Sequence, residues 1–289
     1  MLFDYHTHTP RCHHARGEPV EFAQRAYDLG LDELGFSDHA PWIIQHPGQQ
    51  VAMRPDELPA YVHDIQQLRE QFARTADRPF RIRLGLEMDY VPSRIDAARA
   101  AMQDYRWDYL MGSIHHIGLT ALTSPRESRF LFERCSLEEI AEMYFAAIER
   151  MVAEGFCDVI THLDLPRKYG DFEPGAMLRW VQPLIPRIKA AGMAVEINTS
   201  GVDHPIGQPY PERPVIQALV EAGVPLMVTS DAHTPEQIGR HLEQAYETLR
   251  QLGVTQLVRF EDRRMIPTPM PSRREIDTVV HKRDQMQQV

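Results

Sequence analysis

The stretch Phe3-Asp4-Tyr5-His6-Thr7-His8-Thr9-Pro10-Arg11-Cys12-His13-His14 opens the chain and carries four histidines within nine residues. Residues 2–5 are apolar enough to predict a first β-strand. His6 and His8 then stand two apart, so their side chains lie on the same face of an extended chain. Two imidazoles on one face can chelate a metal ion, whereas a polar turn that happens to be rich in histidine is the alternative. The rest of the chain decides between the two.

Composition and charge limit the class of protein. The chain has 289 residues, 43% of them hydrophobic, which is enough for one large α/β domain or two small ones. No apolar run approaches the roughly 18 residues of a membrane span, and no charged-then-apolar leader is seen, so we expect a soluble, cytoplasmic protein. Three widely spaced cysteines argue against a disulfide framework. The net charge of −10 argues against a general binder of nucleic acid, but a few arginines or metal ions can still hold a small anionic substrate.

Strand and helix candidates alternate along the chain. The strand candidates are residues 2–5, 33–37, 81–87, 109–114, 157–161, 193–197 and 225–229. The helix candidates are residues 18–29, 55–75, 93–105, 136–154, 174–191, 211–222 and 235–252. Loops are expected over residues 40–55 and 118–134, and a last ordered segment over residues 256–260.

Seven strand–helix units without a linker predict one closed or nearly closed parallel (β/α)7 barrel over residues 1–270. A doubly wound open sheet is the alternative, but no Gly-x-Gly-x-x-Gly follows the first strand. Residues 271–289 are charged and rich in glutamine without an apolar period, so we expect a tail that frays at its end.

Polar side chains stand at the ends of the strand candidates: six of the seven end in His, Asp or Glu, and the other in Asn198. The carboxyl ends of parallel barrel strands converge on one face, where such enzymes assemble their sites. A lone histidine is more simply explained by a bond to a backbone carbonyl, but together these residues predict a metal centre. Imidazoles and carboxylates suit Zn, Mn or Fe, and their number implies two or three ions, with Glu87 suited to bridge two of them. Such ions favour hydrolysis, most naturally of phosphate esters.

Seven motifs follow one another in the chain. They are His6-Thr7-His8 with His14, Ser37-Asp38-His39, Gly85-Leu86-Glu87, Gly112-Ser113-Ile114-His115, Thr161-His162-Leu163-Asp164-Leu165, Glu196-Ile197-Asn198-Thr199-Ser200-Gly201 and Ser230-Asp231-Ala232-His233. This ordered set resembles the PHP (polymerase and histidinol phosphatase) phosphoesterases and, among them, the histidinol-phosphate phosphatases. The resemblance covers most of the chain. It implies a distorted (β/α)7 TIM-like barrel with a trinuclear metal site at the carboxyl ends of the strands.

The resemblance also implies a ligand set for each divalent ion. One ion would be held by His6, His8, Glu87 and Asp231, a second by Glu87, His115 and His162, and a third by His14, His39 and His233. His13 and His116 are left beside these ligands, facing substrate or solvent. The implied reaction is attack on phosphorus by a water that the ions activate, with Glu87 as the shared ligand. Asp231 or His233 would protonate the leaving alkoxide through a bound water.

Substrate-binding residues are the least determined part of this prediction. Arg167 and Lys168 are placed to grip phosphate, with a solvated loop pair as the alternative, and Asn198 and His116 are further candidates. Related phosphatases commonly follow the Asn-Thr-(Ser/Ala)-Gly stretch with a basic pair, whereas this chain continues with Val202-Asp203-His204. Either the phosphate relies on Arg167, Lys168 or arginines of residues 118–134, or the substrate differs. Asp203 could instead meet the amino group of histidinol.

The activity that the resemblance implies is hydrolysis of L-histidinol phosphate in histidine biosynthesis. The first alternative is a PHP phosphoesterase for another small ester, such as a nucleotide. A metal-dependent amidohydrolase also opens with His-x-His on a barrel strand, but it often needs a lysine bridge and no lysine precedes Lys168 here. The third alternative is a non-catalytic domain that a metal stabilises, and the intact ligand set argues against it. The expected partner is a small phosphate ester, and neither nucleic acid nor membrane.

Overall fold

A computed structural model gives the structure of the protein and describes residues 1–43 and 50–286. Seven strands form one sheet in the order β1-β2-β3-β4-β7-β8-β9, and all neighbours run parallel. They are β1 Phe3–Asp4, β2 Glu33–Phe36, β3 Arg81–Asp89, β4 Tyr109–Ser113, β7 Val159–Ile160, β8 Ala194–Asn198 and β9 Leu226–Thr229. All seven strand candidates and the barrel class are therefore confirmed.

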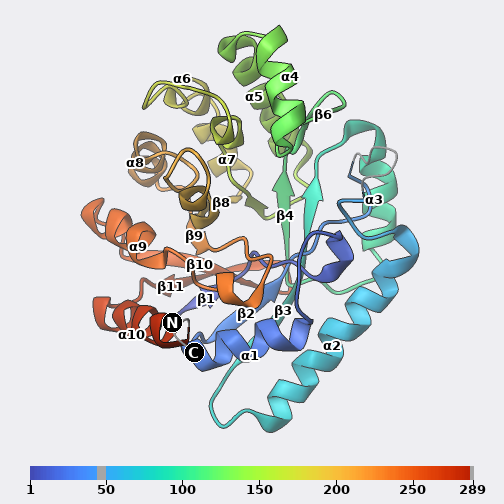
Figure 1. Ribbon diagram of the computed structural model, residues 1–289, viewed down its shortest axis with the longest axis vertical. Coiled ribbons are helices and arrows are strands. Elements are labelled where there is room, and N and C mark those ends of the chain that lie inside the picture. The colour runs from blue at the N-terminus through green and yellow to red at the C-terminus, as the bar shows by residue number, and fades with distance from the viewer. Residues whose placement is uncertain (44–49, 287–289) are drawn as a thin grey trace.

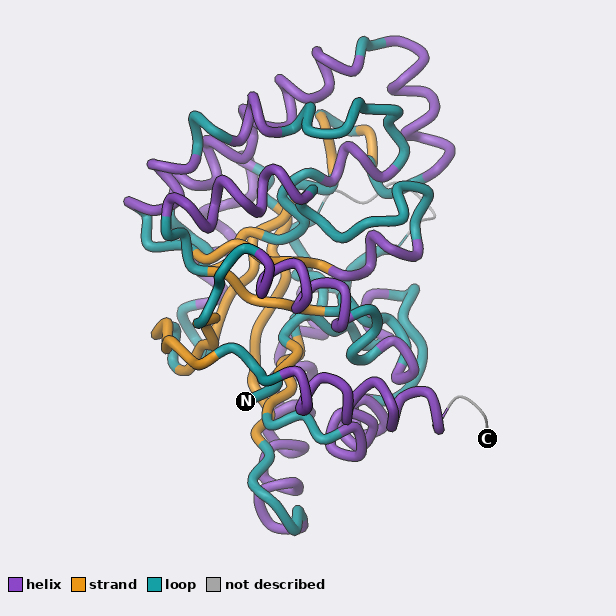
Figure 2. The backbone as a smooth tube through the Cα atoms, turned by 90° about the vertical axis from the view of Figure 1, so that its left-hand side faces the viewer, coloured by secondary structure: helices purple, strands orange, loops and turns teal. Residues whose placement is uncertain are grey.

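Backbone contacts between the first and last strands nearly close this sheet into a barrel. The His8 N–H donates to the Ala232 carbonyl at 2.9 Å, and the Ala232 N–H donates to the His6 carbonyl at 3.0 Å. These bonds lie just past the carboxyl ends of β1 and β9, so the barrel closes at the end where the predicted site residues stand. Figure 1 shows the helices arranged around the strands, and Figure 2 shows the same enclosure from the side.

Helices follow the strands as the alternating pattern predicts. In the described residues they are α1 Pro19–Leu29, α2 Leu58–Thr75, α3 Ile95–Met102, α4 Pro125–Arg134, α5 Leu137–Glu154, α6 Leu178–Val181, α7 Ile185–Ala190, α8 Arg213–Ala222, α9 Leu242–Gln251 and α10 Arg273–Met286. Gly30 ends α1 in the left-handed conformation at φ 95°, which suits glycine because it has no Cβ. None of these helices is long and apolar enough to cross a membrane.

Two predicted helices are broken in the structure. Residues 174–191 form α6 and α7 instead of one helix, because Pro183 lies between them and has no N–H to continue the helical bonding. Residues 235–252 begin as a 3₁₀ turn, Pro235–Gln237, and become helical only at Leu242. Gly239 at φ 69° and His241 at φ 52° separate the two parts, since the left-handed conformation cannot continue a right-handed helix.

The predicted loop over residues 118–134 is partly wrong. Residues 125–134 form α4, whose N-cap Ser124 accepts a hydrogen bond from the Glu127 N–H at 3.4 Å. Before it, β5 His116–Ile117 and β6 Thr120–Ala121 pair as an antiparallel hairpin. In the predicted loop over residues 40–55, residues 40–43 and 50–54 contain no helix, and residues 44–49 lie outside the described part of the chain.

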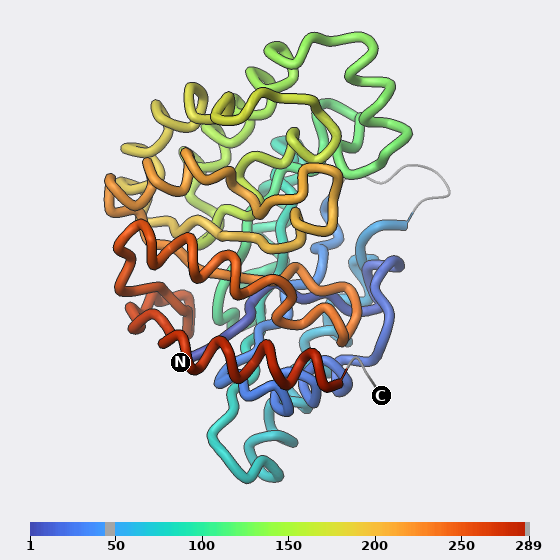
Figure 3. The backbone as a smooth tube through the Cα atoms, turned by 60° about the vertical axis from the view of Figure 1, so that its left-hand side comes forward, coloured from blue at the N-terminus to red at the C-terminus, as the bar shows by residue number. Residues whose placement is uncertain are grey.

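The carboxyl-terminal part contains more structure than the sequence predicts. The last ordered segment is an antiparallel hairpin of β10 Gln256–Glu261 and β11 Arg264–Pro269. Residues 273–286 form α10, so the expected tail is a helix over these residues, and its Ile276 and Val279 are both buried. In Figures 1 and 3, α10 lies beside α1, and the Lys282 ammonium donates to the Asp28 carbonyl of α1 at 2.8 Å. The last three residues of the predicted tail, 287–289, lie outside the described residues.

Buried side chains fill the barrel and fix its shape. The Tyr109 ring occupies space left by two glycines of neighbouring strands, where a Cβ at Gly35 or Gly85 would collide with it. At the amino ends of the strands, the Glu33 carboxylate accepts hydrogen bonds from Arg83 at 3.0 and 3.1 Å. Arg259 of β10 lies 3.3 Å from the same carboxylate, so this buried ion pair also holds the hairpin against the barrel.

Candidate metal centre

The predicted ligands meet at the carboxyl ends of the strands. They follow or end β1, β2, β3, β4, β7 and β9, and they are His6, His8, His39, Glu87, His115, His162, Asp231 and His233. His6, His8 and Glu87 are 0 to 1% exposed, so their polar atoms are removed from bulk water. His14 follows the 3₁₀ turn Pro10–Cys12 and is more exposed than the others. The structure thus brings together residues from six strands, as the convergence argument predicts.

Glu87 lies at the centre of this cluster, and its two oxygens face different histidines. Its Oε2 lies 2.9 Å from His39 Nδ1 and 3.4 Å from His6 Nε2. Its Oε1 lies 3.1 Å from His162 Nε2 and 3.4 Å from His115 Nε2. A carboxylate with each oxygen beside a different set of imidazoles has the geometry of a ligand that bridges two ions.

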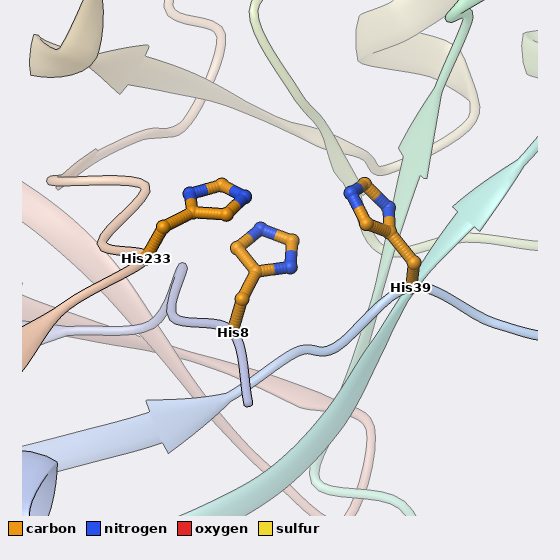
Figure 4. Close-up of side chains that lie close together, drawn as sticks. All are labelled: His8, His39 and His233. Atoms are coloured by element: carbon orange, nitrogen blue, oxygen red, sulfur yellow. The ribbon is translucent and has the colours of Figure 1, made fainter. Parts of the chain in front are cut away.

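A second group of histidines adjoins the first. Figure 4 shows the His8 ring between those of His39 and His233, with the three side chains turned toward one another. The ring centroids of His8 lie 4.0 Å from His233 and 4.5 Å from His39, and the His14 ring lies 4.7 Å from His233. The contacts therefore place His8 between the groups that the resemblance assigns to the first and third ions.

Several of these atoms lie within reach of a common metal ion. Possible ligand atoms lie within 4.8 Å of one another in the groups His6, His8 and Glu87; His8, His39 and His233; and His39, Glu87 and His115. Among the described residues, His6 Nε2, His8 Nε2 and Glu87 Oε2 are buried and form no hydrogen bond, because the polar atoms close to them are not aligned for one. Buried polar atoms that lack a partner cost free energy, which a bound cation would remove. The donor set therefore fits divalent metal ions.

Electrostatics favour the charged form of the carboxylates. Burial raises the pKa of Glu87 and of Asp231, but the surrounding histidines outweigh it and hold both pKa values well below the usual range. Burial lowers the pKa of His115 to about 3, which leaves this imidazole neutral and able to coordinate a metal. Burial also lowers the pKa of His8, but the carboxylates of Asp231 and Asp38 outweigh it and raise the pKa to about 9. Without metal, protons on the imidazoles therefore balance the carboxylates.

Glu196 orients the cluster from behind, a role that the sequence does not reveal. His6 Nδ1 donates to Glu196 Oε1 at 2.5 Å, which leaves Nε2 as the nitrogen that faces the cluster. Glu196 Oε2 accepts from the His162 N–H at 2.8 Å and from Asn198 Nδ2 at 3.1 Å. Asn198 Nδ2 also donates to Asp231 Oδ2 at 3.2 Å. Glu196 and Asn198 thus link three ligand positions, although the sequence motif that contains Glu196 assigns it no such role.

A cavity of about 620 Å³ opens beside the cluster. Its described lining includes eleven histidine, acidic or basic side chains: His14, His39, Glu87, His115, His116, His162, Lys168, His204, Asp231, His233 and Arg240. His116 Nδ1 lies 3.1 Å from Asp89 Oδ2, which orients its ring. Of the substrate-binding candidates, the structure therefore brings His116 and Lys168 to this cavity.

The other three substrate-binding candidates do not line this cavity. Arg167 and Lys168 belong to a 3₁₀ turn, where successive side chains point about 120° apart. Arg167 turns toward Asp164 Oδ2 at 3.0 Å and lines a neighbouring cavity of about 400 Å³, which Lys168 also lines. Asn198 is buried behind Asp231, and Asp203 pairs with Arg240 and His241 at 3.0 and 2.6 Å. The arginines of residues 118–134 do not line the cavity either.

Arg240 is a cavity residue that the sequence prediction does not include. It lies in residues 235–252, where a continuous helix is expected, and its side chain is 13% exposed. The Gly239 that precedes it is the available signal, because glycine is unfavourable inside a helix and often marks a turn.

Known proteins resemble this chain over most of its length. A family model described as the PHP domain matches residues 4–200. A Deinococcus radiodurans protein described as a "Probable histidinol-phosphatase" is 34% identical over 266 residues, covering 92% of this chain and 99% of that protein. A Schizosaccharomyces pombe protein with the same description is 24% identical, and the match covers 90% of this chain and 90% of that protein. The histidinol phosphate phosphatase of Lactococcus lactis, solved with zinc, L-histidinol and phosphate, shares the fold at a TM-score of 0.79 and 20% identity. That match covers 92% of this chain and 98% of the Lactococcus chain.

Proposed function

This chain belongs to the PHP domain family, and on that premise we propose that it is a metal-dependent phosphomonoesterase that hydrolyses L-histidinol phosphate to L-histidinol and phosphate. The observation that carries the proposal is the buried cluster around Glu87, in which His6 Nε2, His8 Nε2 and Glu87 Oε2 face one another without hydrogen-bond partners. The description of the Deinococcus relative and the ligands of the Lactococcus structure support the choice of substrate.

We infer that the site holds three divalent ions, with Zn, Fe or Mn as the candidates. The residues that would hold them are His6, His8, His14, His39, Glu87, His115, His162, Asp231 and His233. Bound divalent ions would lower the pKa of a water molecule toward neutrality and neutralise the oxygens of a phosphoryl group. Buried imidazoles, ionised carboxylates and the lack of clustered thiolates support these metals over softer or harder ones.

Different residues would bind the metal ions, contact the ester and deliver a proton during hydrolysis. Glu87 is the ligand that two ions would share, and the different histidines beside its two oxygens support this role. Lys168 and His116 face the cavity and are candidates for contacts with the ester. The leaving alkoxide needs a proton. We assign its delivery to Asp231 or His233, which would take up the proton that the attacking water loses and pass it on through a bound water, because both line the cavity.

Steady-state phosphate release from metal-loaded protein tests the proposed substrate. We expect kcat/KM for L-histidinol phosphate to exceed that for p-nitrophenyl phosphate and for nucleoside monophosphates by at least roughly 100-fold, because a cavity of this size can contact the whole ester. Equal turnover of all the esters would contradict L-histidinol phosphate as the substrate and indicate a phosphatase that acts on another class of ester. Release of ammonia or amide products without phosphate would favour an amidohydrolase. A cytoplasmic location, and the lack of nucleic-acid partners, stay predictions that cell fractionation and binding assays can test.

A further inference from the structure

The cavity beside the metal centre has two permanent cations among its described lining residues, Lys168 and Arg240. A phosphate monoester carries a charge of about −1.5 to −2 at neutral pH, so its binding needs positive groups. We propose that Arg240 binds the phosphate of the substrate directly, and that Asp203 is a positioning residue that aims the Arg240 guanidinium. This inference rests on the proposed function, since it presumes that the substrate is a phosphate ester.

The Arg240 side chain is held from three sides. Its Nε donates to the Ser230 carbonyl at 2.9 Å, its Nη2 to the Asp231 carbonyl at 2.8 Å, and its Nη1 to Asp203 Oδ2 at 3.0 Å. A guanidinium has five N–H donors in a rigid planar fork. These three bonds leave one N–H on each terminal nitrogen, and both can donate to oxygens of a phosphate.

The backbone around Arg240 is fixed to the turn that carries Asp203. The Arg240 carbonyl accepts from Thr199 Oγ1 at 2.7 Å, and His241 Nε2 lies 2.6 Å from Asp203 Oδ1. His241 has φ 52°, a conformation that costs free energy for a residue other than glycine. Asp203 therefore contacts two consecutive residues of this loop and sets where the guanidinium points, which also explains an acidic residue close to a phosphate site.

The guanidinium lies next to the metal centre. It bonds to the backbone carbonyl of Asp231, and the side chain of Asp231 lies 3.2 Å from His8 Nε2. A phosphate whose oxygens face the metal cluster can therefore reach Arg240 with another oxygen. Lys168 lines the same cavity, so both cations face the space that the anion would occupy.

The test measures the Kd of inorganic phosphate by calorimetry on the metal-loaded protein, because this reading does not depend on turnover. The variants are Arg240→Gln, Arg240→Lys and Asp203→Asn. The matched control is Arg283→Gln: the Arg283 side chain is 11% exposed, donates to the Gly239 carbonyl at 3.1 Å and pairs with Glu243 at 3.2 Å, but does not line the cavity. Metal content is measured for every variant.

We expect Arg240→Gln to raise the Kd of phosphate roughly 10- to 100-fold with metal content unchanged, the range for loss of hydrogen bonds to a charged group. Asp203→Asn and Arg240→Lys should give smaller increases of roughly 3- to 10-fold. Both variants keep a positive charge at residue 240, but its donors are no longer oriented toward the phosphate. Millimolar guanidinium should partly restore phosphate binding to Arg240→Gln, and Arg283→Gln should bind as the wild type does.

An unchanged Kd in Arg240→Gln, an equal increase in Arg283→Gln, or loss of metal together with phosphate binding would each overturn the direct contact. If Arg240→Gln does not fold, Asp203→Asn decides, and an unchanged Kd there overturns the positioning role. Failure of the proposed function is a separate result: the wild-type protein would bind phosphate in an Arg240-dependent way but release none from any phosphate ester.

Discussion

Glu87 is the residue on which the metal centre depends most. Its carboxylate is 1% exposed and lies within 3.4 Å of four different histidine rings, two beside each oxygen. Removing its charge should therefore affect more than one metal position at once, which distinguishes it from a ligand at the edge of the cluster.

We predict that Glu87→Gln sheds metal and lowers phosphate release by at least about 100-fold, since even residues that only orient ligands typically account for 10- to 100-fold. Elemental analysis and a phosphate-release assay on the same sample check this. Glu212→Gln is the control, because Glu212 is also buried but accepts from the backbone N–H of Met177 at 2.9 Å, away from the cavity. Full activity in Glu87→Gln would contradict the shared-ligand role.

The protons on the cluster predict how metal uptake depends on pH. Without metal the pKa of His8 is about 9, because neighbouring carboxylates outweigh burial, so this imidazole is protonated at neutral pH. A ligand nitrogen must lose its proton when metal binds, and metal affinity should therefore fall as the pH is lowered from about 9. Calorimetry at pH 7.5 in buffers of different ionisation enthalpy should detect at least one proton released per chain. Uptake without proton release would contradict this charge balance.

At the scale of elements, α10 is the part of the fold that the sequence pattern hides. Its two buried residues, Ile276 and Val279, stand among charged and glutamine residues and give too few apolar positions to define a period. Neighbouring elements supply the rest: Arg283 pairs with Glu243 of α9, and Lys282 bonds to the end of α1. The helix is therefore stabilised mainly by tertiary contacts, which no local pattern reports.

Ile276→Ala should lower the free energy of unfolding by about 2–4 kcal/mol, the usual cost of removing a buried branched side chain. The value of kcat should not change, since Ile276 does not line the cavity beside the metal centre. Urea denaturation and steady-state kinetics measure the two effects. Asp277→Ala, at an exposed position of the same helix, is the control and should stay within about 0.5 kcal/mol of the wild type. Equal stability of Ile276→Ala would mean that α10 does not contribute to the folded barrel.

At the scale of the whole molecule, the sequence predicts the barrel and the cluster for the same reason. Parallel strands are buried on both faces, so they appear as short apolar runs, and their carboxyl ends converge wherever the barrel closes. His6, Glu87 and Asp231, which are far apart in the chain, could therefore be assigned to one site. The roles of Glu196 and Arg240 could not be predicted. Glu196 lies in a strand, where the sequence does not show which side chains it contacts, and Arg240 lies where a helix is expected. Arg167 and Lys168 are adjacent in sequence, but only the structure shows that Lys168 lines the cavity beside the metal centre and Arg167 does not.

The most direct test of the central claim is a metal titration of activity toward L-histidinol phosphate. The chelated protein should release no phosphate, and turnover should return as Zn, Mn or Fe is added, reaching its plateau at about three ions per chain. Such a result would tie hydrolysis of this ester to the buried cluster of histidines and carboxylates around Glu87. Undiminished phosphate release from the fully chelated protein would contradict the account.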